Sequence, residues 1–378
     1  MKNILFLILI SVFFSCGTKN TRDIGVIERK QNKSLSLKYA KGFSIDVFEE
    51  YNRITVYNPW KQGSILERYY LTKNADTKIP NDGKRVTIPV RTMVSASSTH
   101  YAFIDMLGVT ECLKGVCDIK RTYNSKILEG LKTGKIADLG DPFRINVERC
   151  LMLKPDLVMF SAYNQHDENV ARLLAAGIPV IYNNEWMEEN LLGRAEWIKF
   201  IAAFFEKDEL ADSLFNFVEK KYIGLLSQAE KASSKKPVIL SGDNFRGTWY
   251  QPGSRSFTAK LFADAGGDYI YRKDTTSGSI PFSFEQVFKD LKDADIWVGA
   301  TNGESLNELS LNDQRYSLFK PFREGRIYSY TNRVTPNGGN DYWEGAVARP
   351  DLLLADFIFL FHPELLPNHK LIYIKKLK

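Results

Sequence analysis

Strand-like and helical patterns alternate along most of this chain, and the alternation occurs twice. In the first half, apolar strand-like runs lie at 92–96, 156–160 and 178–182. After Pro237 the alternation returns, with strand-like runs at 238–241, 296–299 and 326–330. Strands that alternate with helices favour mainly parallel sheets, because each crossover helix returns the chain to the same end of the sheet. The predicted fold class is therefore α/β, in two lobes.

A long helical stretch lies between the two halves. From Glu189 to Phe205 apolar residues recur at nearly helical spacing, and the charged residues 206–208 then interrupt the pattern before a second helix at 210–226. We therefore predict two lobes joined by a single long α-helix. The expected bounds are an N-terminal lobe at 34–188, a linker helix at 189–206 and a C-terminal lobe at 207–378.

The region before the first lobe's alternation has a different texture. Apolar and polar residues alternate with period two at 43–48, 54–57 and 69–72, and glycine or Asn-Pro separates these runs. Such a pattern is typical of antiparallel hairpins. The sequence assigns no role to this added N-terminal β-hairpin region.

The first sixteen residues have the pattern of a secretory signal. Lys2 precedes an apolar run at 4–14, and Ser15 and Cys16 follow it. The run is about half the roughly 20 residues that span a bilayer. Residues 13–16 resemble a bacterial lipobox, although Phe14 stands where a small residue is usual. The resemblance implies that Cys16 is acylated and anchors the chain to a membrane of the cell envelope, with 17–33 as a tether; the alternative is an ordinary signal with an incidental cysteine.

Composition and charge narrow the class of protein. The chain has 44% hydrophobic and 25% charged residues, which is typical of a globular protein. The net charge of +6 is spread along the chain, and the densest lysine clusters, at 235–236 and 375–378, are short. We interpret them as solvated surface and expect no nucleic-acid partner.

The cysteines leave one alternative open. Cys112 and Cys117 could form a disulfide in an oxidising compartment, or could be two unpaired thiols around the turn at Gly115. Cys150 lies in an apolar helical pattern, and we expect it to be a small core residue.

Two segments echo one another and carry a family resemblance. In each, a helix with an early glutamate precedes a Pro-Asp or Ala-Asp pair and an apolar strand; the segments are 146–159 and 283–298. With further matches at 106–109, 177–180, 264–267, 325–328 and 361–365, the chain resembles, over 85–370, the periplasmic binding proteins of ABC importers for iron complexes, haem and cobalamin. The resemblance implies two Rossmann-like lobes, a ligand in the cleft, and a stiff helix that limits closure to about ten degrees.

The resemblance also implies a docking role for two carboxylates. In that family a glutamate on each lobe engages arginines of the transporter's membrane subunits, and Glu148 and Glu285 match by position. Two charges at a fixed separation would give such an interface complementarity and a fast on-rate. The alternative is that both are solvated residues near helix N-termini.

Candidate ligand residues follow the strands of the two predicted sheets. Ligands of open α/β sheets bind at the carboxyl ends of the strands. The loops there carry flat rings and cations, and we expect the cleft to include Arg246, Trp249, Tyr250, Tyr163, Trp186, Arg333 and His100. Aromatic walls suit a macrocycle or an aryl chelate, and arginine suits carboxylate groups.

The expected function is therefore capture of an iron complex, a siderophore or haem, by a monomeric lipoprotein that delivers it to an ABC importer. Cobalamin or another corrinoid is the alternative ligand, and surface capture without an importer is a further alternative. A bare-metal site needs several histidines around one ion, and the four in this chain, at 100, 166, 362 and 369, are dispersed. No Gly-x-Ser-x-Gly or His-Glu-x-x-His motif is present, and we expect no enzymatic activity and no cofactor.

Overall fold

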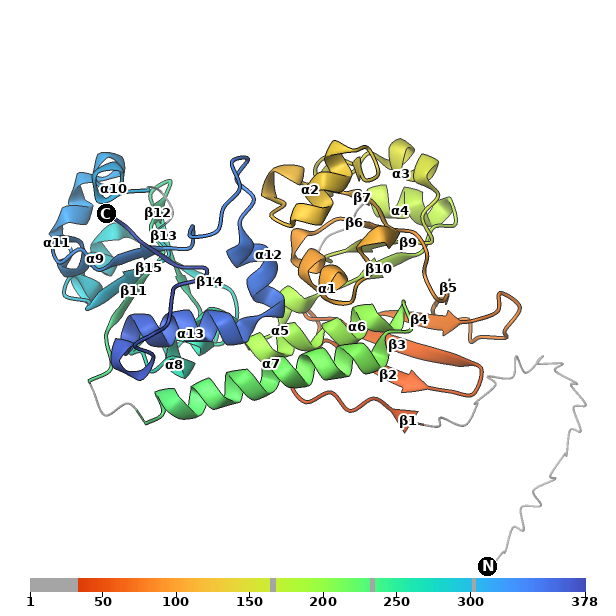
Figure 1. The fold of residues 1–378 in the computed structure, drawn as a ribbon, viewed down its shortest axis with the longest axis horizontal. Coiled ribbons are helices and arrows are strands. Elements are labelled where there is room, and N and C mark those ends of the chain that lie inside the picture. Colours follow the sequence, from red (N-terminus) through yellow and green to blue (C-terminus); the bar gives the residue numbers. More distant parts are fainter. Residues whose placement is uncertain (1–32, 164–167, 232–234, 301–303) are drawn as a thin grey trace, which may run out of the picture.

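The computed structural model describes residues 33–163, 168–231, 235–300 and 304–378. The predicted signal, Cys16 and nearly all of the tether therefore lie outside the described residues. Two α/β lobes stand side by side above a layer of helices, and a further sheet lies below the first lobe (Figure 1). The predicted two-lobed α/β fold is confirmed. Within the described ranges, no helix is both long and apolar enough to cross a bilayer.

The N-terminal lobe is built on a five-stranded, fully parallel sheet of order β10-β9-β6-β7-β8. Its strands are β6 (Met93–Ser95), β7 (Leu113–Val116), β8 (Ala137–Asp138), β9 (Leu157–Phe160) and β10 (Val180–Tyr182). Its helices are α1 (Tyr101–Met106), α2 (Ser125–Lys132), α3 (Val147–Leu153) and α4 (Glu168–Ala175). The central strands are buried throughout, as expected for a sheet that helices cover on both faces.

The C-terminal lobe has two sheets. In the larger one β11 (Ile239–Ser241), β15 (Ile296–Val298) and β16 (Ile327–Ser329) are parallel, and β17 (Lys375–Lys376) adds an antiparallel edge. The smaller sheet is antiparallel and comprises β12 (Asn244–Phe245), β13 (Thr248–Pro252) and β14 (Ser279–Phe282). The helices are α8 (Phe257–Asp264), α9 (Phe284–Leu291), α10 (Leu306–Asn312), α11 (Lys320–Arg323), α12 (Asp341–Ala348) and α13 (Pro350–Phe361).

A single long helix does run beneath both lobes, but it is not the one expected at 189–206. Those residues form two short helices, α5 (Leu191–Glu196) and α6 (Ile198–Ala203), and the long helix is α7 (Asp208–Ala229), which follows the break at Glu206 (Figure 1). The helical ladder is interrupted at Trp197, whose indole Nε1 donates a hydrogen bond to Glu188.

The connecting helices belong to both hydrophobic cores. Phe215 of α7 packs in the core of the N-terminal lobe, and Tyr222, two turns later, packs in that of the C-terminal lobe. The α5–α6 segment divides in the same way, since Leu192 contributes to the second core and Trp197 to the first. Both segments thus connect the lobes, and bending one would require the other to bend as well.

The predicted N-terminal hairpins are confirmed as part of a five-stranded sheet. Its order is β1-β2-β3-β4-β5, with β2, β3 and β4 antiparallel. The strands are β1 (Lys33–Ser34), β2 (Phe43–Val47), β3 (Tyr51–Tyr57), β4 (Ile65–Thr72) and β5 (Lys84–Thr87). One face packs on the connecting helices, where the Phe43 ring lies 4.6 Å from Trp197 and 5.4 Å from Phe200.

Two buried carboxylates attach the segment 38–42 to the connecting helices. The carboxylate of Glu196 accepts hydrogen bonds from the backbone N–H groups of residues 38, 39 and 40 at 2.8–3.1 Å. The carboxylate of Glu188 accepts those of residues 41 and 42 and also the indole N–H of Trp197. We call this set of contacts the amide clamp. It joins the added sheet to the hinge between the lobes.

The lobes also meet directly at α12. The buried carboxylate of Glu344 accepts a hydrogen bond from the backbone N–H of Tyr123 in the N-terminal lobe, at 2.8 Å. Burial, with a contribution from Asp341 and Asp105, raises the pKa of Glu344 to about 7. The interlobe contact therefore holds a group that titrates near neutral pH.

The three described cysteines are free thiols. Cys112 and Cys117 lie at opposite ends of β7, and the strand separates them by about 16 Å of extended chain, too far for a disulfide. Cys150 is fully buried in the core, as expected.

Glu196→Gln should destabilise the chain by about 3 kcal/mol in chemical denaturation. The amide has one acceptor oxygen, whereas the three backbone N–H groups use both carboxylate oxygens, and the change also leaves Lys199 without its buried ion-pair partner. The matched control is Glu219→Gln, since Glu219 meets the side chains of Lys38 and Tyr39 nearer the surface and should cost under about 1 kcal/mol. Equal effects of the two changes would contradict the amide clamp.

The Glu344 contact predicts a pH dependence. The folded chain keeps a proton on Glu344 that the unfolded chain releases near its ordinary pKa of 4.5, so stability should fall as the pH rises from about 5 to about 8. Glu344→Gln keeps an acceptor for the Tyr123 N–H but cannot titrate. Over this pH range its free energy of unfolding should therefore fall by roughly 2–3 kcal/mol less than that of the wild type. Thermal unfolding at several pH values measures this, with the exposed Glu129→Gln as the control; parallel pH curves for Glu344→Gln and wild type would refute it.

Candidate ligand-binding cleft

A cavity of about 980 Å³ opens at the carboxyl ends of the N-terminal lobe's strands. Every strand of that sheet contributes to it through the loop that follows, as the parallel topology requires. The lining from this lobe comprises residues 96–99, 118–121, 138, 140–143, 160, 161, 163 and 186. The C-terminal lobe contributes Gly338, Asn340 and Trp343, so the cavity lies between the lobes.

Aromatic side chains form a continuous wall of the cavity. The ring centroid of Tyr163 lies 5.0 Å from that of Phe143 and 5.6 Å from that of Trp186. Trp343, from the start of α12, lines the cavity from the other lobe. Phe143, Tyr163 and Trp343 are each about half exposed, at 52%, 45% and 51%. Large rings left open to solvent on both lobes provide apolar surface for a flat or apolar ligand.

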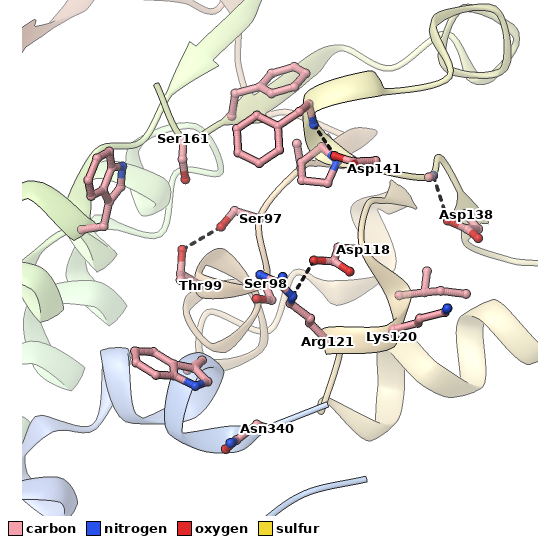
Figure 2. A pocket seen from close by; sticks show the side chains of 18 of the residues that line it. Ser97, Ser98, Thr99, Asp118, Lys120, Arg121, Asp138, Asp141, Ser161 and Asn340 are labelled. Carbon is pink, nitrogen blue, oxygen red and sulfur yellow. Dashed lines mark hydrogen bonds and ion pairs between the residues drawn. The ribbon is translucent and has the colours of Figure 1, made fainter. Parts of the chain in front are cut away.

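Hydroxyl and charged groups line the rest of the cavity (Figure 2). The hydroxyls of Ser97 and Thr99 are 3.0 Å apart, and the guanidinium of Arg121 lies 3.0 Å from the carboxylate of Asp118. Asp138 and Asp141 accept the backbone N–H of Gly140 and Phe143, and these bonds fix the loop after β8. Burial raises the pKa of the Tyr163 phenol, and the charge of Arg121 opposes this rise.

Tyr163 and Trp186 are the two predicted cleft residues that the structure brings to this cavity. The other five lie elsewhere. His100 is fully buried behind it, with Nδ1 3.0 Å from the Ser95 hydroxyl, and burial lowers its pKa to about 3, so the ring is neutral. Arg333 is held between the lobes, over the ring of Tyr123 and 3.1 Å from Asp341. Neither lines the cavity.

The structure corrects the expectation that Arg246, Trp249 and Tyr250 line this cavity. The segment 243–250 forms the β12–β13 hairpin, and side chains alternate across β13, so that Trp249 is fully buried while Tyr250 faces solvent. The Trp249 indole donates to the carbonyl of Ser241 at 2.7 Å and packs 5.5 Å from Trp297, so it is a core residue. Arg246 occupies the hairpin turn with a φ of 54° and lines a separate cavity of about 400 Å³.

The two predicted docking carboxylates lie on the surface, outside the cavity. Glu148 is the second residue of α3, whose cap is Asn146, and Glu285 is the second residue of α9, whose cap is Ser283. Both side chains are about three-quarters exposed, and each meets one arginine: Glu148 meets Arg172, and Glu285 lies 3.4 Å from Arg315. The hydrogen bond from Arg172 lowers the pKa of Glu148. The two lobes thus present matching exposed carboxylates.

Sequence reasoning missed the loops at 118–121 and 138–143. The first of these loops follows β7, a four-residue strand that contains Gly115, and the second follows β8, which has only two residues. Neither segment has a recognisable strand pattern, so no strand was expected there. The signal that could have found one of them is the turn pattern at 138–142, where Asp-Leu-Gly-Asp-Pro follows an apolar pair.

Within the described ranges no group of three or more His, Cys, Asp or Glu side chains could hold a metal ion. The cavity instead offers rings, hydroxyls and a few charges. This set of groups is suited to contact with the surface of an organic molecule.

Comparison with known proteins gives three results. A family model described as periplasmic binding protein matches residues 93–334. An uncharacterized lipoprotein of Methanocaldococcus jannaschii is 26% identical over 94% of this chain and 88% of its own length. The petrobactin-binding protein YclQ of Bacillus subtilis is 24% identical over 59% of this chain and 66% of its own length. Among solved structures, a periplasmic heme binding protein from Pseudomonas aeruginosa matches with a TM-score of 0.58 and 18% identity, covering 76% of this chain and 98% of that one.

A second solved structure, the apo periplasmic heme-binding protein RhuT from Roseiflexus sp. RS-1, matches with a TM-score of 0.55 and 20% identity. The match covers 73% of this chain and 99% of that one. These structures share the fold of this chain. The family match covers more than half of the chain, including the parallel strands of both lobes, the connecting helices and most of the cavity lining. The chain belongs to the periplasmic binding protein family.

Proposed function

We propose that this protein captures an iron complex, a siderophore or haem, in the cavity between its lobes and delivers it to the membrane subunits of an ABC importer. The observation that carries the proposal is the set of half-exposed rings on both walls of one cavity at the carboxyl ends of a parallel sheet. The names of the relatives support it, since they include proteins that bind petrobactin and heme. Its role is binding and transfer, with no catalysis.

Docking to the importer is proposed to use Glu148 and Glu285. Their carboxylates are exposed and lie one on each lobe, so that basic groups on two membrane subunits could engage both at once. Arg172 and Arg315 would release them to these partners at small cost, because exposed ion pairs are weak. The chain would act as a monomer, held at the envelope membrane through Cys16, and the lipoprotein names of two relatives support this anchor.

The ligand proposal is tested with the soluble chain that begins after Cys16. Absorbance and mass analysis should reveal a co-purified or added iron complex, with a Soret band for haem or a ferric charge-transfer band for a siderophore. A corrin spectrum would assign the alternative ligand, cobalamin. Absence of binding by haem, ferric siderophores and cobalamin would contradict the proposal.

A matched pair of variants tests the place of binding. Trp343→Ala removes a half-exposed ring from the cavity and should weaken binding of the tightest such complex about tenfold in a fluorescence titration. Tyr250→Ala removes a ring of similar exposure outside the cavity and should leave affinity unchanged. The opposite ranking would move the site to the β12–β13 hairpin.

Docking is tested by charge reversal. The double variant Glu148→Lys and Glu285→Lys should abolish uptake of the complex by whole cells while binding stays within twofold of wild type, because neither residue lines the cavity. Glu129→Lys, an exposed change elsewhere on the N-terminal lobe, serves as the control. Uptake that survives the double change would favour surface capture without an importer.

A further inference from the structure

The charged groups of the cavity carry information on the ligand that the fold does not. Three carboxylates line it, on Asp118, Asp138 and Asp141, against two cations, on Lys120 and Arg121. The arginines that the sequence suggested for anionic ligand groups are not among them: Arg246 lies at a different cavity, and Arg333 lies beside Asp341 and Tyr123. The lining therefore has an acidic rather than a basic balance.

The position of each charge strengthens this balance. Arg121 is already paired with Asp118, which leaves two carboxylates, on Asp138 and Asp141, against the single remaining cation of the lining, Lys120. Asp138 and Asp141 are held in place by backbone N–H groups of their own turns. In the described part of the chain neither forms an ion pair, and Arg149 donates to the backbone carbonyl of Asp138 rather than to its carboxylate. Among the described residues, no salt-bridge partner therefore offsets either carboxylate at the cavity.

The aromatic wall acts in the same direction. The face of an aromatic ring is electrostatically negative and attracts cations, with tryptophan the strongest. Phe143 lies two residues after Asp141 in the loop after β8 and donates its backbone N–H to that carboxylate, and its ring contacts that of Tyr163. An anionic ligand would meet both the carboxylates and the negative ring faces, whereas a cationic group would be attracted by both.

We propose that the cavity selects an iron chelate of zero or positive net charge and rejects strongly anionic ones. The inference rests on the proposed function and narrows its ligand class. A ferric trihydroxamate is neutral, because three hydroxamate anions balance the ferric ion, and a pendant ammonium makes it cationic. A ferric tris-catecholate carries three negative charges, and the two propionates of haem also make it an anion.

The test is a fluorescence titration of the Cys16-truncated chain with four probes at one ionic strength: ferrichrome (neutral), ferrioxamine B (cationic), ferric enterobactin (tris-catecholate) and haem. The neutral and cationic trihydroxamates should bind at least tenfold tighter than the two anions. Tighter binding of haem or ferric enterobactin would overturn the charge selection and leave capture of an iron complex standing. Absence of binding by all four would overturn both.

Neutral isosteres then test the residues. The double variant Asp138→Asn and Asp141→Asn keeps an oxygen that can accept the turn N–H groups, so the loop should remain folded. The double variant should bind ferrioxamine B at least fivefold more weakly than wild type, bind ferrichrome within twofold of wild type, and bind ferric enterobactin more tightly. Asp274→Asn makes the same change at a turn carboxylate that accepts the N–H of Thr276 outside the cavity, and should change none of these. Equal loss of ferrichrome and ferrioxamine B in the double variant would overturn the assignment.

Discussion

The contact on which the rest of the structure depends is the amide clamp. Five consecutive backbone N–H groups of residues 38–42 converge on two buried carboxylates, that of Glu188 just before α5 and that of Glu196 at its last residue. A buried carboxylate is costly unless hydrogen bonds compensate its desolvation. Breaking the clamp would therefore leave two uncompensated buried charges and destabilise both the added sheet and the hinge. The clamp thereby attaches the N-terminal hairpins, which have no counterpart in the alternating lobes, to the segment that connects the lobes.

A stiff hinge would account for a cavity that is formed without a bound ligand. The α5–α6 segment and α7 each contribute to both cores, and α12 contacts the N-terminal lobe through Glu344. The rings of Tyr163 and Trp343 therefore face one cavity without a large closure, and binding need not overcome the entropy of ordering two separate lobes. The exposed carboxylates Glu148 and Glu285 sit on the same rigid frame, which is what a docking surface that reads their separation requires.

The sequence predicted most of the fold because strand and helix periods differ clearly where one face of an element is exposed. It misplaced the long helix because every residue of 191–203 is buried, so its pattern carries no exposed face. The site was harder. Tyr163 was found because it follows a strong strand, but Phe143 follows a strand of two residues. Trp249 was misassigned because a tryptophan beside an exposed tyrosine has the same pattern in a core strand as in a binding loop.

The central claim is that the lobes are held at a nearly fixed separation. Spin labels at Met152→Cys and Leu311→Cys, both highly exposed, report that separation by pulsed electron resonance in a Cys112→Ser background of the Cys16-truncated chain. The mean distance should change by no more than a few ångströms when the iron complex binds, and its distribution should broaden in Glu196→Gln. A shift on the order of 10 Å on binding would show a flexible hinge and contradict the account.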